Sequence, residues 1–178
     1  MGNSNVKNFK VVTKIPTLKP NILNIEKWVN DKVYSSIKKL KIESLYGVLI
    51  HNSNNFFGDK GKILLEALQS LKKDGKIKKI GISIYDPLEL NYIEDLNKLD
   101  LVQAPMNLID RRLQKSGWLK KLQKNGVEIH VRSVFLQGLL LIKPNKIPTK
   151  FKKWNTILNQ WHYQLEKKKI NAIEACLS

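Results

Sequence analysis

The chain has 178 residues, of which 42 % are hydrophobic and 26 % charged, an ordinary balance for one globular domain. No apolar run reaches the roughly 18 residues that span a bilayer, and the first ten residues lack the apolar centre of a signal peptide. Cys176 is the only cysteine, which excludes an internal disulfide and a zinc site built from several cysteines. We therefore expect a soluble cytoplasmic protein that does not enter membranes.

The formal net charge of +17 at pH 7 raises the question of nucleic-acid binding. Only 3 of the 32 basic side chains are arginine, whereas proteins that read DNA grooves and phosphates favour the bidentate arginine fork. The 29 lysines are dispersed along the chain, as on solvated helix faces. We predict no specific nucleic-acid partner and keep a basic nucleic-acid binder as the least favoured alternative.

Two hydrophobic periods alternate along the chain. Short apolar runs typical of strands cover residues 10–14, 46–50, 77–83, 100–103 and 127–133. Between them, apolar residues recur at helical spacing over residues 22–40, 64–71, 93–96 and 119–122. Asp86, Pro87 and Glu89 match a helix N-cap with a capping box, and Gly75 and Gly126 supply the left-handed residues that end helices. These repeated βα units predict a parallel sheet, closed as a barrel or open and doubly wound.

Polar side chains stand at or just after the end of each predicted strand. They are Lys14, His51, Ser83, Gln103 and the pair Arg132-Ser133. In a (β/α)8 barrel the carboxyl ends of all strands surround one pocket, so this placement favours a barrel with an active site there. Each residue alone is more often structural or solvated, and only their joint placement indicates a site. The chain has no Walker loop, no GxGxxG after a strand and no metal-ligand spacing around its histidines.

Three sequence blocks give more specific evidence about the fold and the function. "LLEALQSLKKDGKIKKIGISIYDPLEL", "VQAPMNLIDRRL" and "VRSVFLQGLLL", in that order, resemble the aldo/keto reductase superfamily, in particular a bacterial branch linked to sugar and polysaccharide biosynthesis. The resemblance runs from about Phe9 to the C-terminus. It implies a (β/α)8 barrel that reduces aldehydes and ketones with NADPH or NADH and without metal. The implied partner is a small-molecule carbonyl substrate such as a sugar derivative.

The resemblance assigns catalytic roles to two residues. Lys14 ends the segment "KVVTK" and matches the lysine that acidifies the family's catalytic tyrosine. His51 follows "VLI" and matches the histidine that hydrogen-bonds the carbonyl oxygen of the substrate. Ser83 and Gln103 match residues that hold the nicotinamide carboxamide.

The segment "RSVFLQGLL" resembles the loop that follows the family's seventh strand. The resemblance places Ser133, Phe135 and Gln137 along the cofactor pyrophosphate, and Arg132 where many members stack an aromatic ring on the nicotinamide. Asn107 and Arg112 belong to a recurring block and are expected to brace loops. Ile84 stands where the common pattern has an asparagine, which removes one partner of the carboxamide.

The family's catalytic aspartate and tyrosine lie before the lysine strand, and residues 1–13 contain neither residue type. The chain therefore resembles strands three to seven of the barrel, and its length falls below the roughly 200 residues of a compact barrel. We expect residues 1–178 to form a single, incomplete aldo/keto reductase domain that is inactive by itself and self-associates through exposed barrel edges. The alternative is a noncatalytic remnant, or half of a split barrel that pairs with another chain.

Overall fold

The computed structural model describes residues 9–56, 58–93 and 96–178. The chain divides into two compact units. Unit 1 contains Met1–Ala104 and Arg112–His130, and unit 2 contains Pro105–Arg111 and Val131–Ser178. Each unit is described by itself below. The expectation of one incomplete barrel domain stays a prediction.

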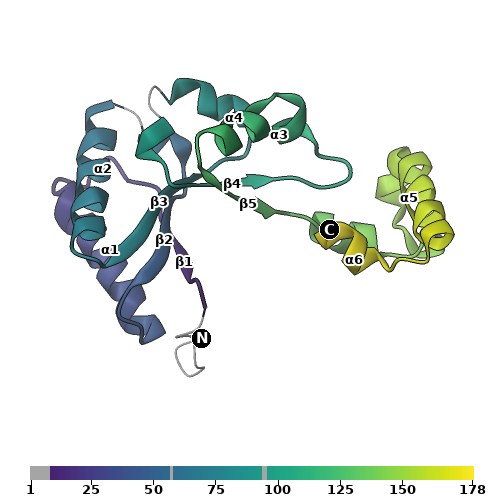
Figure 1. The fold of residues 1–178 in the computed structure, drawn as a ribbon, viewed down its shortest axis with the longest axis horizontal. Helices are drawn as coiled ribbons and strands as arrows, with labels where there is room; N and C mark the ends of the chain where they lie inside the picture. Colours follow the sequence, from purple (N-terminus) through teal and green to yellow (C-terminus); the bar gives the residue numbers. More distant parts are fainter. Residues whose placement is uncertain (1–8, 57, 94–95) are drawn as a thin grey trace. The chain divides into compact units, whose positions relative to one another are not determined.

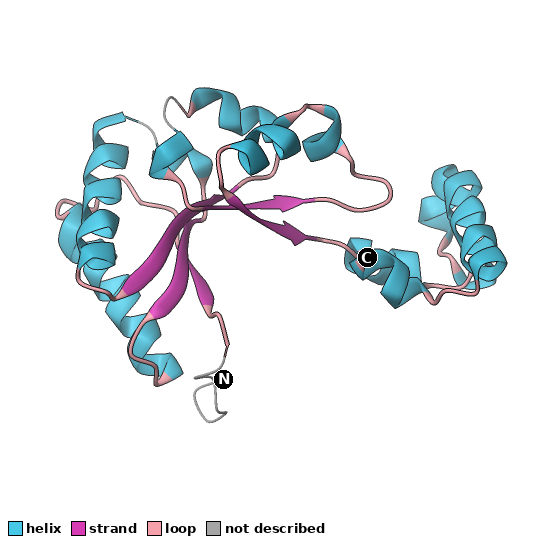
Figure 2. Cartoon of the chain, viewed as in Figure 1, coloured by secondary structure: helices cyan, strands magenta, loops and turns pink. Residues whose placement is uncertain are grey.

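Five strands form one sheet, drawn in magenta in Figure 2. Their bounds are β1 Val12–Ile15, β2 Leu45–Ile50, β3 Ile77–Ser83, β4 Leu101–Pro105 and β5 Glu128–Arg132. The pairs β1–β2, β2–β3 and β3–β4 are parallel. All five predicted strands are confirmed, with ends that shift by no more than a residue or two.

The order of the strands in the sheet is the order in the chain, β1-β2-β3-β4-β5. A doubly wound sheet reverses its strand order at a switch point, whereas consecutive βα units of a barrel place each strand beside the previous one. The observed order therefore confirms the predicted part of a (β/α)8 barrel and excludes the doubly wound alternative for these five strands.

Two long helices, α1 (Ile25–Leu40) and α2 (Gly58–Lys73), cover the outer side of the first strands (Figure 1). Their apolar stripes, which include Val29 and Leu68, are buried against the sheet in one hydrophobic cluster. The sequence pattern began at residue 22, but α1 starts at Ile25 because the Asn24 side chain accepts a hydrogen bond from the Lys27 backbone N–H at 2.8 Å.

The α-helix predicted around residues 93–96 is not found at the two residues of that stretch that the structure describes, Ile93 and Leu96. The chain instead makes two short 3₁₀ turns there, η2 (Pro87–Tyr92) and η3 (Leu96–Lys98), and residues 94–95 lie outside the described part. Each turn closes by a three-residue hydrogen bond, from Ile93 N to Leu90 O and from Leu99 N to Leu96 O. The capping box of Asp86 and Glu89 is confirmed, but the element that it caps is the 3₁₀ turn η2.

Two short helices, α3 (Arg112–Lys115) and α4 (Trp118–Lys124), complete unit 1 (Figure 1). They contribute Leu113, Trp118 and Leu122 to a second hydrophobic cluster with β3 and β4. Gly75 and Gly126 follow α2 and α4 with positive φ angles of 71° and 69°, so the predicted helix ends are confirmed.

Unit 2 is built from the 3₁₀ turns η4 (Leu136–Leu141), η5 (Pro144–Lys146) and η6 (Thr149–Trp154) and the helices α5 (Asn155–Lys168) and α6 (Ala172–Leu177). Its own small core centres on Leu139, Leu140 and Leu158. The Trp161 indole N–H donates to the Leu140 carbonyl at 3.0 Å and ties α5 to η4. Across the described residues, no helix combines the length and the apolar character needed to cross a membrane.

Candidate active site

Three of the residues predicted from the strand ends form one hydrogen-bonded row in unit 1. The Lys14 Nζ donates to the Ser83 hydroxyl at 3.5 Å, and this hydroxyl donates to the Gln103 side-chain oxygen at the same distance. Ser83 is only 2 % exposed and pairs in register with Gln103 across β3 and β4. The sheet thus brings together an ammonium group, a hydroxyl group and a carboxamide from three different strands.

His51 lies one residue past the end of β2, at the same edge of the sheet. Its backbone N–H donates to the Ile15 carbonyl at 3.2 Å, which continues the pairing of β2 with β1. Its side chain is half-buried and lines a hollow of about 510 Å³. The structure therefore places the predicted catalytic histidine beside a space large enough for a small molecule.

Sequence reasoning missed the other residues that line this hollow. They come from the loops after β1, β2 and β3 and comprise Thr17, Asn52, Ser53, Asn54, Tyr85 and Glu89. The sequence carried part of the signal for these lining residues, since four polar residues follow His51 directly. Tyr85 carried no such signal, because only the folded connection from β3 to β4 brings it next to the loop after β2.

The structure shows what Ile84 does at the position where the common family pattern has an asparagine. Ile84 is 0 % exposed and belongs to the hydrophobic cluster shared by β3, β4, α3 and α4. Its backbone N–H donates to the Gln103 carbonyl at 2.9 Å. The side chain at this position thus packs into the core, so Ser83 and Gln103 are the two polar side chains that this part of the sheet offers to a carboxamide.

The remaining predicted cofactor residues, Arg132, Ser133, Phe135 and Gln137, lie in unit 2. Their loop has an unusual backbone: Ser133, Leu136 and Gln137 have φ angles of 61°, 47° and 54°, followed by Gly138 at 89°. Such conformations are costly for residues with a side chain and are concentrated at binding and catalytic sites. The strain at Leu136 is invisible in the sequence.

The two expected bracing residues each hold a loop. Arg112 pairs with the Asp86 carboxylate at 2.7 Å and donates to the Tyr85 carbonyl at 3.2 Å, which fixes the start of η2 in unit 1. In unit 2, the Asn107 amide donates to the Ser133 carbonyl at 3.1 Å, and its oxygen accepts from the backbone N–H groups of Ile109 and Asp110, each at 2.9 Å. Neither residue lines the hollow beside His51.

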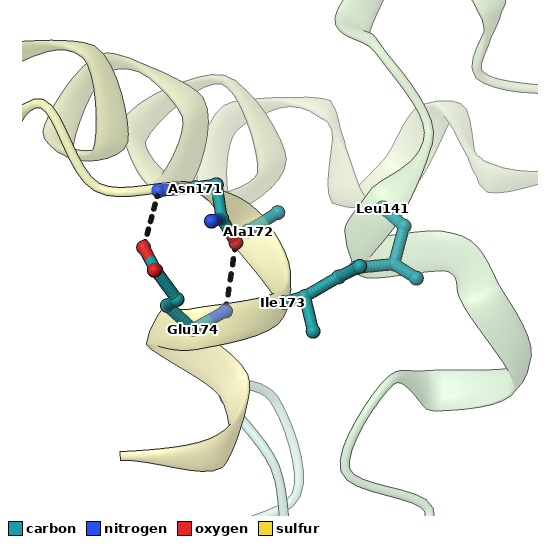
Figure 3. A pocket seen from close by; sticks show the side chains of 5 residues that line it. All are labelled: Leu141, Asn171, Ala172, Ile173 and Glu174. Carbon is teal, nitrogen blue, oxygen red and sulfur yellow. Dashed lines mark hydrogen bonds between the residues drawn. The ribbon is translucent and has the colours of Figure 1, made fainter.

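A second hollow lies in unit 2 and is shown in Figure 3. Leu141 and Ile173 face each other across it, and Asn171 and Glu174 bond each other as the capping box of α6. The Asn171 oxygen accepts from the Glu174 backbone N–H at 2.9 Å, and the Glu174 carboxylate accepts from the Asn171 N–H at 3.4 Å. These polar groups therefore stabilise a helix end, and the hollow beside His51 is the better candidate for a site.

Comparison with characterised proteins points to the same family that the sequence resembles. It is 27 % identical over 114 residues to an NADH-specific methylglyoxal reductase of Escherichia coli, an alignment that covers 63 % of this chain and 34 % of that protein. It is 30 % identical over 108 residues to a glyoxal reductase of Bacillus subtilis, covering 60 % and 37 %. The aligned part thus spans little more than a third of the length of these relatives.

Solved structures share the fold. A glycerol dehydrogenase of Gluconobacter oxydans superposes with a TM-score of 0.68 at 21 % identity, covering 93 % of this chain and 57 % of that one. The holo form of an aldo-keto reductase of Bacillus halodurans superposes with a TM-score of 0.60 at 24 % identity, covering 78 % and 47 %. Residues 2–177 match the aldo/keto reductase family as a whole. The chain therefore belongs to the aldo/keto reductase family.

Proposed function

We propose that this chain provides the central strands of an NAD(P)H-dependent reductase of small aldehydes and ketones, such as sugar derivatives. The observation that carries the proposal is the row Lys14–Ser83–Gln103, with His51 at the same edge of the sheet beside a hollow. The names of the relatives support the substrate class, since two of them are reductases of the small dicarbonyls glyoxal and methylglyoxal.

The residues present fit a nicotinamide cofactor. The Ser83 hydroxyl and the Gln103 amide, 3.5 Å apart, offer a donor and an acceptor side by side, which is what a carboxamide requires. The family resemblance assigns Ser133, Phe135 and Gln137 to the pyrophosphate and Arg132 to the ring, and the strained backbone of residues 133–138, considered within unit 2 alone, supports a binding role for that loop. When bound, the dinucleotide supplies the hydride that reduces the carbonyl carbon.

His51 and Lys14 would act on the oxygen side of the reaction. His51 would hydrogen-bond the carbonyl oxygen and stabilise the negative charge that develops there. Lys14 would place a positive charge beside the proton donor, which in the family is a tyrosine. Because residues 1–13 include no tyrosine and no aspartate, we propose that the isolated 178-residue chain binds dinucleotide but does not turn over.

The first test is turnover by the isolated chain. We expect the rate of NADPH or NADH oxidation with methylglyoxal to equal the rate of a Lys14→Ala/His51→Ala double variant, because loss of a general acid alone costs about 10² to 10⁴ in rate. A spectrophotometric assay at 340 nm measures it. Oxidation clearly above that of the double variant would show that the chain has a working acid and would overturn the inactivity proposal.

The second test is dinucleotide binding, followed by the fluorescence of the reduced nicotinamide. We expect Gln103→Leu to weaken binding about tenfold, because a lost hydrogen bond and an unsatisfied amide cost about 1–2 kcal/mol. Gln69→Leu, at an exposed position on α2 in the same unit, is the matched control and should leave binding unchanged. If the unaltered chain binds neither dinucleotide, the noncatalytic alternative takes the place of the reductase.

A further inference from the structure

We propose that residues 143–154 of unit 2 attach this chain to an anionic lipid surface through five lysines and the ring of Trp154. The attachment is peripheral, since no helix among the described residues could cross a membrane. The inference goes beyond the proposed function, because the attachment needs neither a dinucleotide nor a carbonyl substrate and uses none of the residues assigned to them.

Residues 143–154 combine positive charge with aromatic rings. They contain no aspartate and no glutamate, and their five lysines are Lys143, Lys146, Lys150, Lys152 and Lys153. All five lysines are exposed. None of them forms an ion pair with a carboxylate of the described residues. Their charge is therefore available to an external anion.

The turn η6 arranges its side chains in stripes. In a 3₁₀ helix, residues three apart lie on the same face. Phe151 and Trp154 therefore form an apolar stripe, and Lys150 and Lys153 form a second stripe beside it. Lys152 lies on the third face of the turn. The aromatic stripe thus has lysine on both sides, an arrangement typical of amphipathic segments that lie in a membrane interface.

Contacts within unit 2 hold this segment in place. Ile147 and Phe151 pack against the small hydrophobic core of the unit. The Phe151 N–H donates to the Pro148 carbonyl at 2.9 Å and closes the first turn of η6. The side chain of Trp154, by contrast, remains 37 % exposed. The segment therefore presents its ring and its charges from a backbone that is already ordered, which lowers the entropic cost of binding.

The surroundings of the two rings favour a lipid surface over a nucleic acid. Proteins that bind single strands stack bases on exposed aromatic faces. Here the Lys150 Nζ lies over the Phe151 ring, 5.1 Å from its centroid, and the Lys153 Nζ lies over the Trp154 ring at 5.3 Å. A stacking base would have to displace these ammonium groups. At a membrane interface, tryptophan lies at the level of the headgroups while neighbouring lysines reach the phosphates.

The test is cosedimentation of the 178-residue chain with lipid vesicles. We expect the chain to bind vesicles of phosphatidylglycerol and phosphatidylcholine, to leave vesicles of phosphatidylcholine alone unbound, and to dissociate as salt is added. The triple variant Lys150→Gln/Lys152→Gln/Lys153→Gln should weaken binding about 100-fold, because each lysine near an anionic surface contributes about fivefold. No binding to the anionic vesicles overturns the inference.

The lysines at the far end of α5 supply the matched control. Lys167→Gln/Lys168→Gln/Lys169→Gln removes the same charge at exposed positions of the same unit. The 14 residues of α5 span about 21 Å, twice the screening length of about 10 Å at 0.1 M salt, and separate these lysines from residues 143–154. We expect this variant to bind within about threefold of the unaltered chain. An equal loss in both triple variants would show that net charge alone drives binding and would overturn the inference.

Trp154→Ala tests the role of the ring. It should weaken vesicle binding about threefold, because the indole no longer enters the interface. Tyr163→Ala, at a 61 % exposed position on α5, is its control and should leave binding unchanged. A single-stranded oligonucleotide, compared at equal phosphate concentration, tests the other polyanion. Tighter binding to the oligonucleotide than to the anionic vesicles, or an unchanged affinity of Trp154→Ala for the vesicles, overturns the lipid assignment.

Discussion

Gly81→Ala should destabilise unit 1 by about 3 kcal/mol, because a methyl group added there would overlap the backbone of the neighbouring strand. Gly81 lies in the middle of β3, where it pairs with Leu49 of β2 and Leu101 of β4. A Cβ atom there would overlap the Leu101 carbonyl oxygen and lie 2.9 Å from its carbonyl carbon and 2.8 Å from the Leu49 Cδ2 atom. The backbone of β4 would have to move away from β3.

Gly47→Ala is the matched control for this prediction. Gly47 lies on β2, and its added Cβ would meet only side-chain atoms of Leu101 and Val12 at 3.2 to 3.6 Å. Side chains can rotate where a backbone carbonyl in a sheet cannot, so we expect a cost below about 1 kcal/mol. Urea unfolding followed by circular dichroism measures both free energies. Equal costs for the two variants would contradict the assignment of the penalty to backbone overlap.

The second large effect that we expect is a loss of stability when a charge cluster near the amino-terminal ends of the strands is altered. The Glu128 carboxylate of β5 bonds the Lys79 ammonium of β3, accepts from the Tyr46 hydroxyl at 2.6 Å and contacts the His130 ring nitrogen at 2.7 Å. The bond to Lys79, then that to Tyr46, lowers the pKa of Glu128 to about 2. In barrels this end of the strands serves stability, so we expect Glu128→Gln to cost about 2 kcal/mol at pH 7.

The pH dependence of stability can show that the Glu128 carboxylate makes this contribution. Because the folded pKa of Glu128 lies below its ordinary value of 4.5, its contribution is complete above pH 4.5 and is lost as the pH falls from there through about 2. The pKa of its partner, Lys79, shifts in the opposite direction. The bond to Glu128 raises the pKa of Lys79, so the contribution of the ammonium is present below pH 10.5 and is lost at a higher pH.

We expect the free energy of unfolding of the unaltered chain to fall between pH 4.5 and 2 more steeply than that of Glu128→Gln. Urea titrations at several pH values in this window measure the difference. Glu66→Gln, at an exposed position on α2, should change stability by less than about 0.5 kcal/mol and keep the steep fall. Identical pH profiles for the unaltered chain and Glu128→Gln would show that another group carries the acid sensitivity.

Local sequence patterns were sufficient to predict much of the fold. The strand β3 has the predicted bounds, because a glycine turn at Gly75 precedes it and the polar Ser83 ends it. The capping box of Asp86 and Glu89 could be predicted from the sequence because its hydrogen bonds join residues two or three apart in the chain. The helix expected around residues 93–96 is not found at Ile93 or Leu96, because apolar spacing over a few residues cannot separate a 3₁₀ turn from an α-helix.

The sequence by itself determined the βα alternation, the polar ends of the strands and the resemblance that points to Lys14 and His51, since all three depend on neighbouring residues or on fixed motifs. Only the tertiary structure decided the strand order, the row from Lys14 through Ser83 to Gln103, and the meeting of Tyr85 with the loop after β2. It also decided that Ile84 packs in the core and that Leu136 has a positive φ. The physical reason is that these features depend on contacts between residues far apart in the chain, or on strain that the surrounding fold sustains, and neither leaves a local pattern.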